Sequence, residues 1–155
     1  MDQATFEAGL ATRKEVLGPE HVERSLAKVT DFSRPVQELV TEYCWGEVWT
    51  RDGLERRTRS LLNLVMLTAL NRMHELAVHV RGAVRNGCTE TEIQEALLQT
   101  AVYCGAPAAL ESFRVAERVL NELKDELTNE QQDTQQNKPQ DEQQNGQQDE
   151  GTTGS

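Results

Sequence analysis

Every apolar side chain in this sequence of 155 residues lies before residue 128, Pro139 apart. From Thr128 onward the sequence consists almost entirely of Gln, Asn, Asp, Glu, Gly and Thr. Such a stretch buries too little apolar surface to offset the entropy that is lost when a chain becomes ordered. We therefore predict one folded domain in residues 1–127 and a disordered, acidic, Gln-rich tail in residues 128–155.

Within the first 127 residues, apolar side chains recur at the spacing of an α-helix, and strand-like alternation is almost absent. The most apolar segment, about residues 54–72, has apolar positions around most of its circumference, which indicates a central helix. Thr89 and Glu92 form the pattern of a capping box at the start of a later helix, which Gly105 ends. The sequence predicts an all-α fold, a compact bundle of about six or seven helices.

Composition excludes several classes of function. The tail carries six carboxylates and one lysine, so the domain is only mildly acidic, and it lacks a Lys/Arg stripe interleaved with aromatic residues. Nucleic-acid binding is disfavoured, because neutralising phosphates requires clustered positive charge. The longest nearly uncharged apolar run, residues 61–70, is too short to cross a bilayer, and the first thirty residues do not resemble a signal peptide. Cys44, Cys88 and Cys104 are odd in number and widely spaced, which favours reduced thiols and a cytoplasmic protein.

Two histidines form an imperfect version of the zinc motif HExxH. His74 and His79 are separated by five positions, whereas two ligands on one helix face are separated by four. Positions i and i+5 lie about 140° apart around a helix, so both imidazoles cannot hold one ion, and we predict no metal site. His79 lies at the border of its helix's apolar stripe, where a half-buried imidazole can titrate usefully. The alternative for His79 is an ordinary surface or capping histidine.

Three further clusters combine polar and apolar side chains. In residues 45–51 two tryptophans bracket Glu47 and precede Arg51, which suits a small anionic ligand but equally suits core packing beside a surface ion pair. Three arginines in residues 56–59 begin the central helix, and one of them could clamp a carboxylate bidentately. Residues 103–107 lead from one helix into the next, either beside a cleft or as an ordinary turn.

These segments resemble the 4-carboxymuconolactone decarboxylase family. The resemblance rests on blocks in matching order and spacing at residues 45–51, 57–62, 75–81, 86–87, 102–105 and 107–109, and it spans about Phe6 to Leu120. The family belongs to the wider alkylhydroperoxidase D-like superfamily of helical proteins. Members on the peroxidase side carry C-x-x-C-x-x-x-H, and the two cysteine positions are Arg72 and Glu75 here, so reduction of peroxides by a dithiol is not expected.

The resemblance implies conversion of 4-carboxymuconolactone to 3-oxoadipate enol-lactone and CO2, a step of protocatechuate catabolism in the β-ketoadipate pathway. Loss of CO2 sends electrons into the lactone carbonyl, so the substrate carries its own electron sink and no cofactor is implied. The resemblance also implies a homo-oligomer, with a hexamer as the expected form. The alternatives are a decarboxylase of another lactone or keto acid, and a non-catalytic helical oligomer of the same fold.

This chemistry sets tasks for which the matching segments offer candidates. Arg51 and Arg59 are the candidates for holding the acetate arm of the dianionic lactone, beside a wall formed by Trp49. His79 or Tyr103 could donate a hydrogen bond to the lactone oxygen as it gains negative charge, which is worth about 3–4 kcal/mol in a preorganised site.

Protonation of the α-carbon requires a general acid. We expect His79 to deliver this proton, with Glu47 orienting it, and Glu47 is the alternative acid if burial against the tryptophans raises its pKa. One residue departs from the family pattern: Leu110 occupies a position that is usually polar. If this position contacts the substrate, one edge of the site is less polar here.

Overall fold

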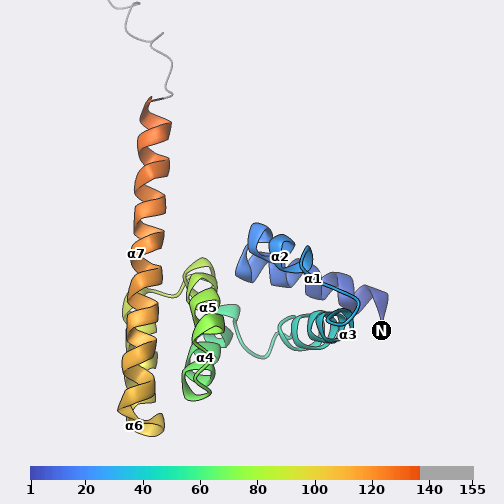
Figure 1. Ribbon diagram of the computed structural model, residues 1–155, viewed down its shortest axis with the longest axis horizontal. Helices are drawn as coiled ribbons and strands as arrows, with labels where there is room; N and C mark the ends of the chain where they lie inside the picture. Colours follow the sequence, from blue (N-terminus) through green and yellow to red (C-terminus); the bar gives the residue numbers. More distant parts are fainter. Residues whose placement is uncertain (137–155) are drawn as a thin grey trace, which may run out of the picture. The chain divides into compact units, whose positions relative to one another are not determined.

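The computed structural model describes residues 1–136, and within that range every regular element is helical (Figure 1). The all-α class predicted from the sequence is confirmed. The elements in this range are α1 (Gln3–Leu17), α2 (Pro19–Leu26), α3 (Arg34–Leu39), the π-helix η1 (Val40–Val48), α4 (Arg56–Ala69), α5 (Met73–Arg85), α6 (Glu90–Cys104) and α7 (Ala106–Gln136). Residues 1–121 form one compact unit, which contains all the candidate site residues.

The helix ends follow from local sequence chemistry. Helix α6 begins with the predicted capping box: Thr89 Oγ1 accepts from the backbone N–H of Glu92 at 3.2 Å, and a Glu92 carboxylate oxygen accepts from that of Thr89 at 2.8 Å. Gly18 and Gly105, which end α1 and α6, have φ values of 94° and 100°, a region in which a side chain would be strained. Glycine at these positions lets the chain turn sharply into the next helix.

The chain continues from α3 into η1 without a break, and η1 is wound more loosely than an α-helix. The Trp49 N–H donates to the Cys44 carbonyl oxygen at 3.1 Å, which is the i to i−5 bond of a π-helix. The segment ends at Val48, with Trp49 as its C-cap residue. π-Helical segments occur often at functional sites, and this one contains Trp45.

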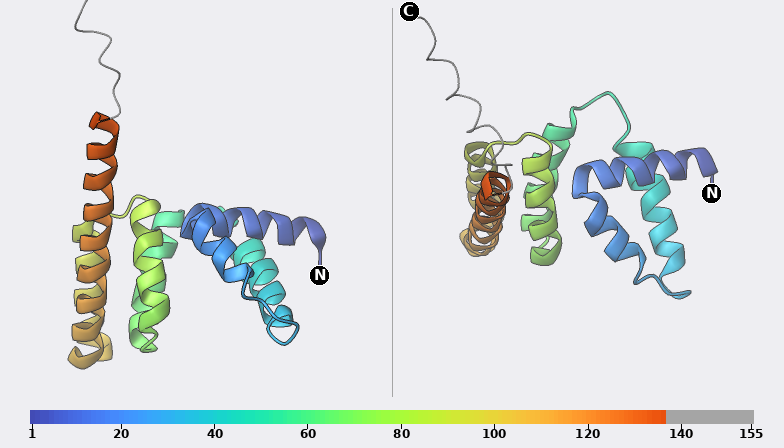
Figure 2. Two further views of the ribbon diagram at one scale, coloured as in Figure 1. Left: turned by 45° about the horizontal axis from the view of Figure 1, so that its top comes forward. Right: turned by 90° about the horizontal axis from the view of Figure 1, so that it is seen from above.

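Helix α1 packs closely against η1, because glycine stands at the contact on both sides (Figure 2). A Cβ atom on Gly9 would collide with the Thr41 carbonyl oxygen and would lie 2.7 Å from the Gly46 nitrogen. A Cβ atom on Gly46 would collide with the carbonyl oxygen of Thr5. Only glycine at both positions allows the two backbones to approach this closely.

The N-terminal helices and η1 share one hydrophobic cluster, which consists of Val16, Leu17, Val22, Trp45 and Trp49. Helix α5 adds Val78 to this cluster, so its N-terminal half faces the tryptophans. The contact explains why residues far apart in the sequence meet around His79.

Helix α4 packs against both α5 and α6, as expected for a central helix. Leu64 of α4, Leu76 and Val80 of α5, and Ile93 and Leu97 of α6 are fully buried there. The circumference of α4 is not covered completely, because its other apolar face, formed by Leu62, Met66 and Leu70, is exposed.

Helix α7 runs past Leu127 to Gln136, so residues 128–136 are helical and not irregular as the sequence analysis expected. This part of α7 contains Glu and Gln, which favour helix, and the first proline beyond it is Pro139. The Thr128 hydroxyl also donates to the Lys124 carbonyl oxygen at 2.9 Å. The rest of the predicted tail, residues 137–155, lies outside the described residues.

Across residues 1–136, no helix combines the length and the hydropathy needed to cross a membrane.

The Gly9 contact makes a stability prediction. We expect Gly9→Ala to lower the free energy of unfolding by about 1–3 kcal/mol or more, because the added methyl group has backbone, not a flexible side chain, in its way. Gly53→Ala is the matched control, since nothing lies within 4 Å of a Cβ atom there. Urea unfolding of both variants measures the difference, and equal stabilities would contradict the proposed cause of the α1–η1 contact.

Candidate active site

His79 lies on α5 with its imidazole facing the indole of Trp45. The two rings are nearly parallel, with an interplanar angle of 2° and centroids 6.3 Å apart. His79 is half-buried, which matches the first of the two alternatives that its spacing left open. Its neighbour Val78 packs against the tryptophan cluster.

Burial lowers the pKa of His79 from 6.5 to about 4, because the surroundings disfavour its charged form. The nearby His21 lowers the pKa further, whereas Glu75 raises it. The imidazole is therefore neutral at neutral pH.

Asn63 of α4 is the polar neighbour of this imidazole. Its Nδ2 lies 3.5 Å from His79 Nδ1, at the long end of a hydrogen bond. If the Asn63 amide nitrogen donates to Nδ1, the remaining imidazole proton lies on Nε2. In this tautomer His79 presents an N–H donor on the side away from Asn63.

Trp45 and Trp49 stack on each other with ring centroids 4.9 Å apart, and both are buried. They belong to the hydrophobic cluster, so core packing is part of their role, and Trp45 also faces His79. Glu47 lies between them in sequence but is exposed. The burial of Glu47 against the tryptophans, which the alternative acid requires, is absent, because neighbouring positions of a helical turn face different sides.

The three arginines in residues 56–59 bind different partners. Arg56 forms an ion pair with Glu15, and Arg57 forms one with Glu92. Arg59 is half-buried, and its Nη2 donates to the Arg51 carbonyl oxygen at 3.1 Å, while its Nε is buried without a partner. Arg51 is exposed. A hydrogen bond from the Arg59 side chain to the Arg51 backbone therefore joins these two residues.

Tyr103 lies elsewhere in the described chain. It is 80 % exposed at the C-terminal end of α6 and lines a groove of about 500 Å³ with Leu61, Leu62 and Val65 of α4. Among residues 1–136, no hydrogen bond or ring contact joins Tyr103 to His79. Leu110, on α7, is exposed.

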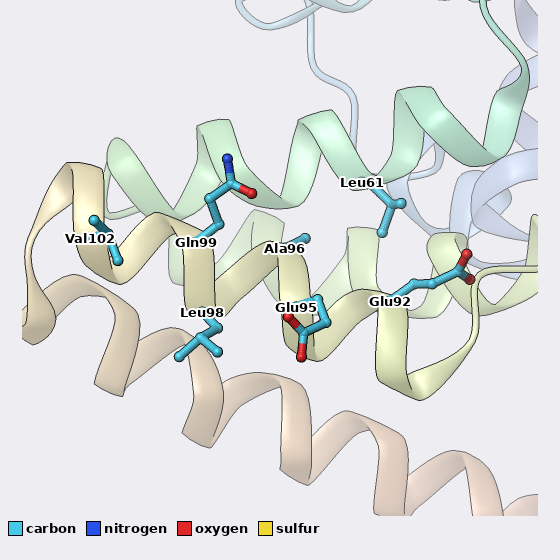
Figure 3. Close-up of a pocket in the computed structure, with 7 residues that line it drawn as sticks. All are labelled: Leu61, Glu92, Glu95, Ala96, Leu98, Gln99 and Val102. Atoms are coloured by element: carbon cyan, nitrogen blue, oxygen red, sulfur yellow. The ribbon is translucent and has the colours of Figure 1, made fainter.

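A second groove of about 540 Å³ lies on the same pair of helices (Figure 3). Leu61 and Gln99 extend between α4 and α6, whereas Glu95 and Leu98 extend on the other side of α6. None of the candidate site residues lines this groove. Among the predicted site residues, Trp49 belongs to the tryptophan cluster and His79 faces it.

Two neighbours of His79 were not predicted from the sequence. His21 of α2 is half-buried, and its pKa is lowered by burial and by the charges of Arg24, Arg13 and His74. Asn63 of α4 is the second, and its place as the polar residue in the apolar run of residues 61–67 was the available clue. Over the described residues, no three His, Cys, Asp or Glu side chains are grouped so that they could hold a metal ion.

The fold and the site define a small helical protein in which a neutral, half-buried imidazole faces a buried tryptophan pair. The chain belongs to the carboxymuconolactone decarboxylase family, whose sequence model matches residues 34–118.

Individual relatives extend the match over most of the chain. It is 48 % identical to a nitrosuccinic acid decarboxylase of Metarhizium robertsii over 121 residues, which cover 78 % of this chain and 85 % of that protein. It is 42 % identical to a 4-carboxymuconolactone decarboxylase of Acinetobacter baylyi over 122 residues, which cover 79 % and 91 %. The fold and family expected from the sequence are therefore confirmed, and the two relatives carry different substrate names.

The pKa of His79 predicts how stability changes with pH. The unfolded chain binds a proton at His79 below about pH 6.5, whereas the folded chain binds it only below about pH 4. The free energy of unfolding should therefore fall as the pH drops from 6.5 to 4, by up to about 3 kcal/mol for this group.

Urea unfolding between pH 4 and 7.5 tests this expectation. His79→Gln should show a shallower fall than the native chain, whereas His74→Gln, at an exposed position, should keep the native slope. Parallel curves for the native chain and His79→Gln would contradict the burial of a neutral imidazole.

Proposed function

We propose that this chain is a cofactor-independent decarboxylase of a small dicarboxylic acid that carries its own electron sink, with 4-carboxymuconolactone as the first candidate substrate. The observation that carries the proposal is the neutral imidazole of His79, held between Trp45 and Asn63 in a member of this family. An N–H donor in a partly desolvated place suits a reaction that develops negative charge on a substrate oxygen.

A second candidate substrate is nitrosuccinic acid, because a relative with that name is 48 % identical. The two acids share the feature that matters chemically. Each has one carboxylate that leaves and a second that stays, and each places a carbonyl or nitro group where it receives the electrons of the broken bond. One site with an oxyanion donor serves both reactions.

His79 is proposed to act in two stages. In the first stage the neutral imidazole donates its N–H to the lactone or nitro oxygen as that oxygen gains charge. A bound dianion raises the pKa of this imidazole, because a nearby negative charge favours the imidazolium form. His79 then takes up a proton from solvent and delivers it to the α-carbon of the lactone dienolate or, with nitrosuccinate, to the carbon that lost CO2. Glu47, which is exposed, is proposed to exchange protons with solvent in support.

The test is CO2 release by the purified chain from 4-carboxymuconolactone and from nitrosuccinate, with and without a chelator. We expect turnover of at least one acid, unchanged by the chelator. His79→Gln should lower kcat by about 10²-fold to 10⁴-fold, because it removes the donor and the acid. His74→Gln, at an exposed position, is the matched control.

Other outcomes decide against parts of the proposal. Turnover that needs a metal would reject the cofactor-independent reaction. Full activity of His79→Gln would reject the role of the imidazole. No release from either acid would favour a decarboxylase of another lactone or keto acid, or a helical oligomer without activity.

We further propose that the chain forms a homo-oligomer, as the family resemblance implies. Support comes from large apolar side chains that are exposed on α3 and η1, on α4 and on α6: Val36, Leu39, Tyr43, Leu62, Met66, Leu70, Val102 and Tyr103. Apolar faces of this extent mark interaction surfaces on soluble proteins.

Sedimentation velocity tests the assembly. We expect a mass several times that of one chain, and Leu62→Asp should shift it towards the monomer by placing a charge on an apolar face. Gln94→Asp adds the same charge at an exposed polar position of α6 and should leave the mass unchanged. A monomeric native chain at micromolar concentration would contradict the proposal.

A further inference from the structure

Arg13 is a buried cation for which the described chain provides no counter-ion. It lies on α1 and is 7 % exposed. Its Nη1 donates to Gln37 Oε1 at 3.1 Å and to Thr41 Oγ1 at 3.3 Å, and both acceptors are neutral. No carboxylate in residues 1–136 pairs with it. A buried charge without an opposite charge is costly, which makes this residue a candidate for binding an anion.

The free donors of Arg13 lie on one edge of the guanidinium group. The two Nη1 hydrogens face Gln37 and Thr41, whereas Nε is buried without an acceptor. Nη2 has no partner among the described residues either. The Nε and Nη2 hydrogens point in parallel, and this edge binds the two oxygens of a carboxylate as a fork. This edge, which is the one that recognises carboxylates, therefore has no acceptor among residues 1–136.

Arg13 and His79 approach the same segment of the chain. Arg13 donates to Thr41 of η1, and Trp45, about one turn further along η1, faces the imidazole of His79. His21 links the two electrostatically, because the charge of Arg13 lowers the pKa of His21 and His21 lowers that of His79. A small molecule beside Trp45 would therefore lie in the positive field of Arg13.

We propose that the Nε–Nη2 edge of Arg13 binds the carboxylate that the substrate retains, so that Arg13 selects dicarboxylic over monocarboxylic acids. This inference rests on the proposed function and replaces Arg51 and Arg59 in that role. Arg51 is exposed to water, which weakens its attraction for an anion, and Arg59 already donates to a backbone carbonyl. Arg13 has the buried, prearranged donors that a bidentate contact needs.

A binding experiment tests Arg13 without requiring turnover. Succinate and succinamate have the same skeleton, but succinamate carries a neutral amide in place of one carboxylate. In isothermal titration calorimetry, the native chain should bind succinate about 10-fold to 100-fold more tightly, the range expected for hydrogen bonds to a charged group. Arg13→Met and Arg13→Lys should lose most of this preference, because neither side chain offers the fork.

The control keeps the same change of charge at another arginine. Arg34→Met removes an exposed arginine that pairs with Asp31 at 3.1 Å on the surface, and it should keep the native preference for succinate. Circular dichroism and thermal melting of each variant report folding. If Arg13→Met does not fold, Arg13→Lys carries the test, since it keeps the buried charge.

A native chain that binds both compounds equally or binds neither would overturn the inference, and so would an Arg13→Lys chain with native preference. In turnover assays, Arg13→Lys should raise KM about 10-fold to 100-fold with a smaller change in kcat. Native KM in that variant would reject Arg13 while leaving the decarboxylase proposal intact. A preference for succinate without CO2 release from either candidate acid would reject the proposed function and keep the Arg13 site.

Discussion

The close approach of α1 and η1 is the constraint on which the site depends. Gly9 and Gly46 remove the side chains that would hold these helices apart, and the Thr41 carbonyl occupies the space next to Gly9. This contact places Arg13 against Thr41 on one side. It also places Trp45 in the hydrophobic cluster against which Val78 of α5 packs. The imidazole of His79 then has a flat apolar wall to lie against.

That wall has an electrostatic effect. Apolar surroundings make a charged imidazole unfavourable, so the fold keeps His79 neutral at a pH where a free histidine would be partly charged. Arg13 remains charged although it is buried, because a guanidinium group does not lose its proton under ordinary conditions. The site thus combines one fixed positive charge with one group whose charge depends on what binds beside it.

Much of the fold could be predicted because it depends on local patterns. Apolar spacing and caps such as Thr89 with Glu92 identify helices, and the border position of His79 indicated its half-burial. The neighbours of His79 could not be predicted in this way. His21, Asn63 and Trp45 come from three separate helices, and only tertiary packing brings them together. Arg13 lies in a helix whose pattern is unremarkable, so its burial became visible only in three dimensions.

Two features of the structure differ from what the sequence suggested, for physical reasons that can be named. Glu47 was the alternative acid on the condition that it is buried against the tryptophans, and it is exposed, because a helical segment directs successive side chains to different sides. The tail was expected to begin at residue 128 because apolar residues end there. Helix propagation needs only suitable backbone formers and no stop signal, and α7 therefore continues to Gln136.

The position of the tryptophans has one more consequence. Trp45 and Trp49 are the only tryptophans in the chain, and both lie within the cluster that borders His79. The tryptophan fluorescence of the protein therefore originates entirely at the candidate active site. Protonation of the neighbouring imidazole, or arrival of a ligand against the indole, changes the surroundings of the only strong emitters. The molecule carries a built-in optical reporter of its own site, which requires no label.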